Sequence, residues 1–270
     1  MVEWLTPAIS ERALVLWQRW TGVVVVGYLI IRVRALTSAP PDWDPVALLG
    51  GLSGPVPTAV LWLLWLAALA GALLWVRRIE SIQWAAPLGA VAFVLLLAHR
   101  SSGGQILWFD ILPALHVLVL ASVGTRFDPV RAGWAMRLAS LITVITYVLA
   151  GVAKLRYGGL EWVSEGALER NIAFSAARFD TLGGTPSPFA AALLDLGFIS
   201  IPLGIGVVAI ELGAPLALLN NRVGWAWSGL AWFMHLVIAG TMFVIFHWPL
   251  FGIAFVPLLL LSKQSHRVTV

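Results

Sequence analysis

Six ionisable side chains lie within or at the ends of long apolar stretches and are the residues of this sequence that could do chemistry. They are His99, Asp110, His116, Lys154, Glu211 and His235. A charged group at bilayer depth costs on the order of 2.5–3.5 kcal/mol, so each of them needs a partner, water or a function. Imidazole, carboxylate and amine groups are the side chains that accept and donate protons in enzymes. Whether these six converge in space does not follow from their order in the chain.

Lys154 ends an apolar run in the stretch YVLAGVAKLRYGGLEW, and two interpretations stay open. In the first it is a base. A free lysine has a pKa of about 10.4 and holds its proton at neutral pH, but apolar surroundings disfavour the ammonium form. In the second it is an anchor whose long side chain reaches out to the membrane surface.

The other candidates also have structural alternatives. Asp110 could pair with Arg100 or cap the start of a helix, and His116 and His235 could be interior histidines hydrogen-bonded across helices. Glu211 lies in GVVAIELGAPLALL, where no cation is nearby in sequence, so it must face a partner or water.

Other classes of chemistry find little support. The histidines and carboxylates show no HxxxH or HxxE spacing, so we expect no metal. The chain has no cysteine, which excludes disulfides and thiol chemistry. It has no GxSxG nucleophile motif, no phosphate-binding loop and no nucleic-acid-binding module.

The composition is that of an integral membrane protein. The 270 residues are 60% hydrophobic and 11% charged, about half the charged share of a soluble domain. Because a bilayer offers the backbone no partners, spanning segments are expected to be helices. The sequence therefore predicts an all-α, polytopic transmembrane bundle forming a single domain over residues 1–270, in contact with membrane lipids.

Apolar runs near the length that crosses a bilayer predict about eight spans. They are placed at about 14–33, 56–76, 85–99, 106–123, 133–155, 200–219, 223–246 and 248–262. Between the fifth and sixth lies an amphipathic insert, about 157–188, expected to include a helix on the membrane surface. The stretch SPFAAALLDLGFISIP is either re-entrant or an extension of the sixth span.

Basic residues set the expected orientation, because cytoplasmic loops are enriched in Lys and Arg. The side of the N-terminus would hold Arg12, Arg19, Arg77, Arg78, Arg126, Arg131, Arg137, Arg222, Lys263 and Arg267. The other side would hold Arg32, Arg34, Arg100, Arg156, Arg170 and Arg178, together with Asp42, Asp44, Glu161, Glu165, Glu169 and Asp180. Both termini are therefore expected in the cytoplasm of a multi-pass protein of the cell membrane.

Two segments carry a family resemblance. The segment MRLASLITVITYVLAGVAKLRYGGLEWVSEGAL resembles the signature region of the HTTM superfamily, the membrane domain shared with vitamin K-dependent gamma-carboxylase. The matching elements are Arg137–Leu138, Tyr147, Ala150–Gly151 with Lys154–Leu155, and Trp162 with Gly166, the last pair one residue further apart. Downstream, VVAIELGAPLALLNNRVGWAWSGLAWFMHLVIA resembles a second family segment through Glu211, Pro215 and His235.

The resemblance implies a reaction. In the carboxylase, the lysine that matches Lys154 deprotonates a reduced naphthoquinone. The resemblance and the positions of the ionisable residues together predict Lys154 and His235 as catalytic residues and Glu211, Tyr147, His116 and Asp110 as cofactor-binding residues, although His116 and Asp110 lie outside the matching motifs. The cofactor would be a reduced menaquinone or vitamin K-type quinol, a lipid-soluble quinone.

The departures from the family matter as well. The carboxylase has a large soluble part after its membrane region, whereas this sequence ends at Val270, and the family's paired lysines are Ala153 and Lys154 here. Three classes of function stay open. They are a quinol-linked oxidoreductase or carboxylase-like enzyme, a non-enzymatic membrane accessory subunit with an unknown protein partner, and a small-solute or proton-coupled carrier.

Overall fold

The structure is a computed structural model of the whole chain. It describes residues 8–38, 49, 54–77, 85–101, 108–124, 127–164, 166–181, 183–185 and 187–262. Among the charged residues used for orientation, Asp42, Asp44, Arg78, Arg126, Glu165, Lys263 and Arg267 lie outside these ranges. In the described residues all regular structure is helical, so the predicted all-α class is confirmed.

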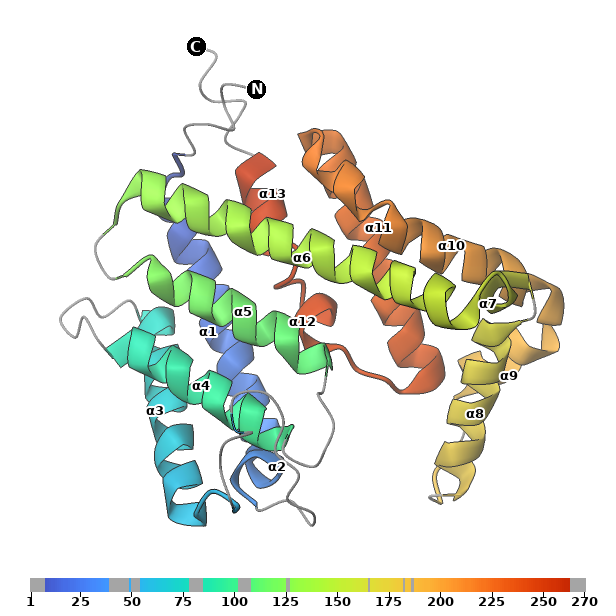
Figure 1. Cartoon of the computed structure of the whole chain (residues 1–270), viewed down its shortest axis with the longest axis horizontal. Helices are drawn as coiled ribbons and strands as arrows, with labels where there is room; N and C mark the ends of the chain where they lie inside the picture. Colours follow the sequence, from blue (N-terminus) through green and yellow to red (C-terminus); the bar gives the residue numbers. More distant parts are fainter. Residues whose placement is uncertain are drawn as a thin grey trace. The chain divides into compact units, whose positions relative to one another are not determined.

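Contacts divide the described chain into two compact units (Figure 1). Unit 1 contains the described residues up to Ile142, and unit 2 is Thr143–Ser262. The boundary falls inside the longest helix, α6 (Pro129–Gly158), so α6 contributes its first part to unit 1 and its second part to unit 2. Each unit is described by itself below.

Unit 1 is a bundle held together by close helix contacts. Besides the start of α6 it contains α1 (Glu11–Ile31), α2 (Val33–Thr37), α3 (Thr58–Arg77), α4 (Ala85–Arg100) and α5 (Trp108–Ser122). Helix α3 packs against α1 and α4, and α4 packs against α5. Gly71 of α3 and Gly89 of α4 face each other so closely that a Cβ on Gly71 would lie 2.7 Å from the Cα of Gly89. Small residues allow such contacts between membrane helices, where van der Waals packing drives association.

Unit 2 begins with the second part of α6 and continues through short and long helices. These are α7 (Glu161–Ser164), α8 (Ala167–Thr181), α9 (Pro188–Asp195), η3 (Gly197–Ile199), α10 (Ser200–Leu212), η4 (Ala214–Leu218), α11 (Asn221–Met242), α12 (His247–Leu250) and α13 (Val256–Ser262). Helix α11 packs against η4, α10, α12 and α13. Helices α7 and α8 pack against α10.

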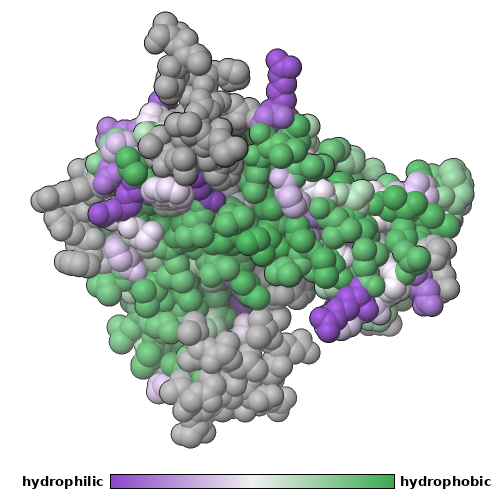
Figure 2. Space-filling model, turned by 45° about the horizontal axis from the view of Figure 1, so that its top comes forward, coloured by the Kyte–Doolittle hydropathy of each residue, from purple (hydrophilic) through white to green (hydrophobic). Residues whose placement is uncertain are grey.

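Four of the described helices, α1, α3, α6 and α11, are long and apolar enough to cross a membrane. A fifth is obtained if α9 and the η3–α10 segment, which meet at an angle of 88°, form one broken span. Figure 2 shows that hydrophobic residues make up most of the described surface on the face in view. Large hydrophobic side chains such as Leu63, Leu66 and Leu149 are exposed in the structure. By their length and composition these helices are compatible with the membrane protein that the composition predicts.

Several predicted spans differ from the observed helices. The stretch 248–262 is not one helix but α12 and α13, separated at Gly252, whose φ of +75° lies in the left-handed region. The stretch 223–246 leaves the helix after Met242, because Phe243 adopts a φ of 52°. The stretch 200–219 changes from α-helix to 3-10 helix near Pro215, a residue that cannot donate a backbone hydrogen bond.

The insert 157–188 forms two helices instead of one continuous amphipathic helix. Helix α7 ends before Gly166, whose φ of +68° starts a new direction, and α8 follows. Helix α8 contacts α7, α9, α10 and α11. Ile172 is buried in these contacts, as a helix with one apolar face requires.

Candidate functional site

Lys154 and Glu211 form an ion pair between two helices of unit 2. The amine nitrogen of Lys154, on α6, lies 2.5 Å from Oε1 of Glu211, on α10. The Lys154 side chain is 26% exposed and the Glu211 side chain is 7% exposed. Glu211 therefore has the partner that its apolar surroundings demand, and Lys154 points to a buried carboxylate instead of extending freely to the surface.

Local sequence explains why Glu211 needs a cation. Helix α10 ends at Leu212, with Pro215 shortly after, so Glu211 lies in the last turn of the helix. The partial negative charge at a helix C-terminus disfavours a carboxylate. The ammonium group of Lys154 offsets this unfavourable interaction.

Gly151 makes the ion pair possible. It lies one turn before Lys154 on α6, and a Cβ at this position would come within 2.9 Å of Leu212 Cδ2 and 3.1 Å of Glu211 Cβ. The absence of a side chain lets α10 approach α6 at the level of Glu211. The glycine of the AGVAK motif therefore has a physical role beside the lysine.

Trp162 covers the other side of the lysine. The Lys154 nitrogen lies 5.5 Å from the centroid of the Trp162 ring, within the distance of a cation–π interaction. A Cβ on Gly158 would lie 2.9 Å from Cδ1 of Trp162, and one on Gly204 would lie 3.8 Å from Cζ3. Trp162 thus packs on glycines of two helices, α6 and α10. The sequence identified Trp162 only as a matching element of the family resemblance, without a contact to Lys154.

Tyr147 and His235 form a second polar pair in unit 2. The Tyr147 hydroxyl lies 2.7 Å from Nε2 of His235, and both side chains are buried. The rings of Trp227 and Phe255 contact Tyr147, and that of Phe246 contacts His235. This pair is the cross-helix hydrogen bond foreseen for His235, with Tyr147 as the partner.

The two pairs belong to one cluster, defined as Tyr147, Lys154, Glu211 and His235. Tyr147 and Lys154 are seven residues apart, which places them on one face of α6 about 10.5 Å apart along its axis. Lys154 interacts electrostatically with His235, and Glu211 interacts electrostatically with Tyr147. The structure therefore brings together four of the six residues predicted as catalytic or cofactor-binding.

Two atoms of the cluster lack a hydrogen-bond partner among the described residues. They are Oε2 of Glu211 and Nδ1 of His235, both buried. Leaving a buried polar atom unpaired costs about 1–3 kcal/mol. The cluster thus leaves one carboxylate oxygen and one ring nitrogen without a partner among the described residues.

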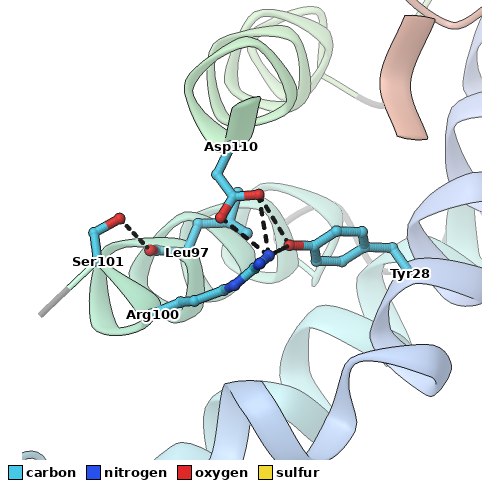
Figure 3. Close-up of polar contacts among 5 residues, drawn as sticks. All are labelled: Tyr28, Leu97, Arg100, Ser101 and Asp110. Atoms are coloured by element: carbon cyan, nitrogen blue, oxygen red, sulfur yellow. Dashed lines mark hydrogen bonds and ion pairs between the residues drawn. The ribbon is translucent and has the colours of Figure 1, made fainter. Parts of the chain in front are cut away.

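Asp110 belongs to a separate network in unit 1. Arg100 Nη1 lies 3.2 Å from Asp110 Oδ2 and donates to the Tyr28 hydroxyl at 2.5 Å, and Tyr28 donates to Asp110 Oδ1 at 3.0 Å (Figure 3). The Arg100 partner considered for Asp110 is therefore present. Tyr28 carries no signal in the sequence, because nothing near it shows that α1 contacts two charged residues from α4 and α5.

His116 also lies in unit 1. Its side chain is 1% exposed, and its ring forms a hydrogen bond with the backbone of Ala139. This agrees with an interior histidine held across helices. The cofactor-binding role of Asp110 and His116 stays a prediction from their positions in apolar segments.

The described part of the chain contains no cluster of side chains that could bind a metal ion. No three His, Asp or Glu side chains there lie close enough together to hold a metal ion. The cluster of unit 2 instead contains a carboxylate, an amine, an imidazole and a phenol. These groups suit proton transfer and the binding of hydroxyl or carbonyl oxygens.

Comparison with protein-family models, with curated proteins and with solved structures found no match. The resemblance to the HTTM superfamily therefore stays a prediction that depends on the motif residues alone.

Proposed function

We propose that this chain is an HTTM-type multi-pass membrane protein that binds a reduced, lipid-soluble quinone and removes a proton from it. The quinol would be of the menaquinone or vitamin K type, and the reaction would belong to an oxidoreductase or a carboxylase-like enzyme. The proposal includes about eight spans, α8 on the membrane surface and both termini in the cytoplasm. Because the chain has no cysteine, single cysteines introduced into loops and labelled from each side would test that topology.

The Lys154–Glu211 pair is the observation that carries the proposal. It places a cation and a carboxylate with an unpaired oxygen within an apolar helix bundle. Charged pairs inside a membrane bundle are expensive and commonly mark sites of proton or substrate handling. The neighbouring Tyr147–His235 pair adds a second group that can exchange protons.

The competing function is that of a non-enzymatic membrane subunit. One observation favours it, because the Lys154–Glu211 pair also joins α6 to α10 and would stabilise a scaffold. The two functions differ in what they require of the unpaired atoms. A scaffold has no use for Glu211 Oε2 or His235 Nδ1, whereas a quinol-binding site needs acceptors and donors of that kind.

Quinone content distinguishes the two. The full chain is purified in mild detergent from cells that contain menaquinone, and the bound lipid is extracted and identified by mass spectrometry. We expect quinone to copurify with the wild-type protein and to be lost in Lys154→Ala. Arg156→Ala is the matched control, since this exposed cation lies two residues away and stacks on Tyr157. Equal and negligible quinone in all three proteins would support the scaffold instead.

A further inference from the structure

We infer that Oε2 of Glu211 is the atom that receives the proton of the bound quinol, while Lys154 keeps its own proton and stabilises the resulting anion. This inference rests on the proposed function and assigns the roles within its ion pair. It changes the role implied by the family resemblance, in which the lysine itself is the base.

The first argument is the state of the lysine. Nζ of Lys154 donates to Oε1 of Glu211 at 2.5 Å, and an ammonium donor with a carboxylate acceptor forms the stronger, charge-assisted kind of hydrogen bond. The face of the Trp162 ring, 5.5 Å away, also attracts a cation. An ammonium group has three donors and no lone pair, so in this arrangement Lys154 cannot accept a proton.

The second argument is the state of the carboxylate. Lys154 occupies only Oε1, and Oε2 is buried without a hydrogen bond to any described residue. An ionised carboxylate offers about four acceptor sites on its two oxygens. Glu211 is therefore the member of the pair with acceptor capacity left for a substrate hydroxyl.

The third argument concerns the remaining candidate, His235. Its Nε2 lies 2.7 Å from the Tyr147 hydroxyl. When Tyr147 donates this hydrogen bond, the neutral ring carries its proton on Nδ1. The unpaired Nδ1 then donates to a ligand instead of accepting from it, so His235 is suited to hold a substrate oxygen while Glu211 takes the proton.

The step is balanced without any other reactant. The O–H bond of the quinol breaks, a new O–H bond forms on Oε2 of Glu211, and the electron pair stays on the quinol oxygen. The products are a protonated Glu211 and a quinolate anion. Because the carboxylate has lost its charge, the ammonium of Lys154 becomes the counter-ion of the quinolate, which stabilises the product in apolar surroundings.

The test uses two substitutions with opposite expectations. Lys154→Arg keeps a cation that cannot be deprotonated in a protein, whereas Glu211→Gln keeps the shape of the side chain but removes the acceptor. Menadiol, a reduced naphthoquinone without an isoprenoid chain, is added anaerobically to the full-length protein in detergent. Quinolate formation is followed by its ultraviolet–visible absorbance, and carboxyl protonation by infrared difference spectroscopy.

We expect Lys154→Arg to form quinolate within about tenfold of the wild-type amount and to show the carbonyl band of a protonated carboxylic acid. Glu211→Gln should bind menadiol but show neither quinolate nor the band. Glu169→Gln, a second glutamate of unit 2 that accepts a hydrogen bond from Ser200, should behave as the wild type.

Contrary results separate the inference from the proposed function. If menadiol binds but Glu211→Gln still forms quinolate, or if Lys154→Arg abolishes it while Glu211→Gln does not, the assignment to Glu211 is wrong and the quinol site stands. If menadiol does not bind to the wild-type protein, the proposed function and this inference both fail.

Discussion

Units 1 and 2 each contain a partly buried ion pair between helices and a buried tyrosine, and each carboxylate has one oxygen without a hydrogen bond, yet the two arrangements differ in how the tyrosine takes part. In unit 1 the tyrosine is part of the pair, because the Tyr28 hydroxyl accepts from Arg100 and donates to Asp110 (Figure 3). In unit 2 the tyrosine bonds to His235, and Glu211 meets Lys154 through one oxygen only.

The position of each pair on its helices adds to the contrast. Arg100 ends α4 and Asp110 lies in the first turn of α5, so both helix dipoles favour the charges. Glu211 lies at the C-terminal end of α10, where the dipole opposes its charge. The first pair is therefore electrostatically favourable at each end, whereas the second depends on Lys154.

The chemistry of the cations points the same way. Arginine stays charged under all conditions a protein meets, whereas lysine can lose its proton when its surroundings change. The network of unit 1 is suited to joining three helices. The cluster of unit 2 has groups that can change their protonation and is suited to a reaction.

Removing the carboxylate of each unit in turn should give the largest difference in stability between the two units. Asp110→Ala leaves a guanidinium that cannot become neutral, and removing one partner of a buried pair costs about 3–5 kcal/mol. Glu211→Ala should cost less, because Lys154 is more exposed than Arg100, 26% against 14%, and can deprotonate. Chemical unfolding in detergent micelles, followed by tryptophan fluorescence, measures both losses.

A paired replacement controls for the volume lost in Asp110→Ala. In Arg100→Met combined with Asp110→Leu no buried charge is left unpaired, so most of the stability should return. Equal losses for Asp110→Ala and Glu211→Ala would contradict the structural role given to the unit 1 network.

The glycine contacts of the two units give the next largest effect. In Gly71→Ala the new methyl group would meet backbone, with Gly89 Cα at 2.7 Å, so α3 and α4 must separate at a cost of about 1–3 kcal/mol. In Gly151→Ala it would meet the side chain of Leu212 at 2.9 Å, which can move. We expect a smaller loss of stability there, together with reduced quinone retention, because Glu211 is displaced from Lys154.

Unfolding in detergent and quinone extraction on the same samples measure these two properties. Gly27→Ala on α1 is the control, since nothing lies within 4 Å of its added methyl group. A loss of quinone in Gly71→Ala without loss of stability would show that retention does not report on the unit 2 cluster.

The sequence predicted the parts of this molecule that depend on local pattern. Hydropathy located most of the helices, because an apolar run in a membrane has only helix to form. It also identified Lys154, Glu211 and His235, because a charged or imidazole group in an apolar run stands out. The predicted spans were less accurate where backbone conformation decided the helix end, as at Phe243 and Gly252.

The contacts between helices could not be predicted in the same way. That Glu211 meets Lys154 depends on the approach of α10 at Gly151, over a separation of 57 residues. Tyr28 accepts a hydrogen bond from Arg100, 72 residues away, and because it carries no charge the sequence gives no sign of this contact. Such pairings follow from packing in three dimensions, on which the spacing of residues in one segment carries no information.

The smallest expected effect concerns the reactivity of the Lys154 amine beside the Trp162 ring. The chain has only two lysines, Lys154 and Lys263, so Lys263→Arg leaves one side-chain amine for a water-soluble acylating reagent. Only the neutral amine reacts, and the Trp162 ring stabilises the ammonium by about 0.5–1 kcal/mol. In this background Trp162→Ala should therefore raise the acylation rate of Lys154 about two- to fivefold, and Trp162→Phe should raise it less.

Mass spectrometry of the labelled peptide measures the rate. Tyr157→Ala is the control, because the Tyr157 side chain is exposed. An unchanged rate in Trp162→Ala would mean that the indole neither shields the amine nor stabilises its charge, and that Glu211 alone holds the proton on Lys154.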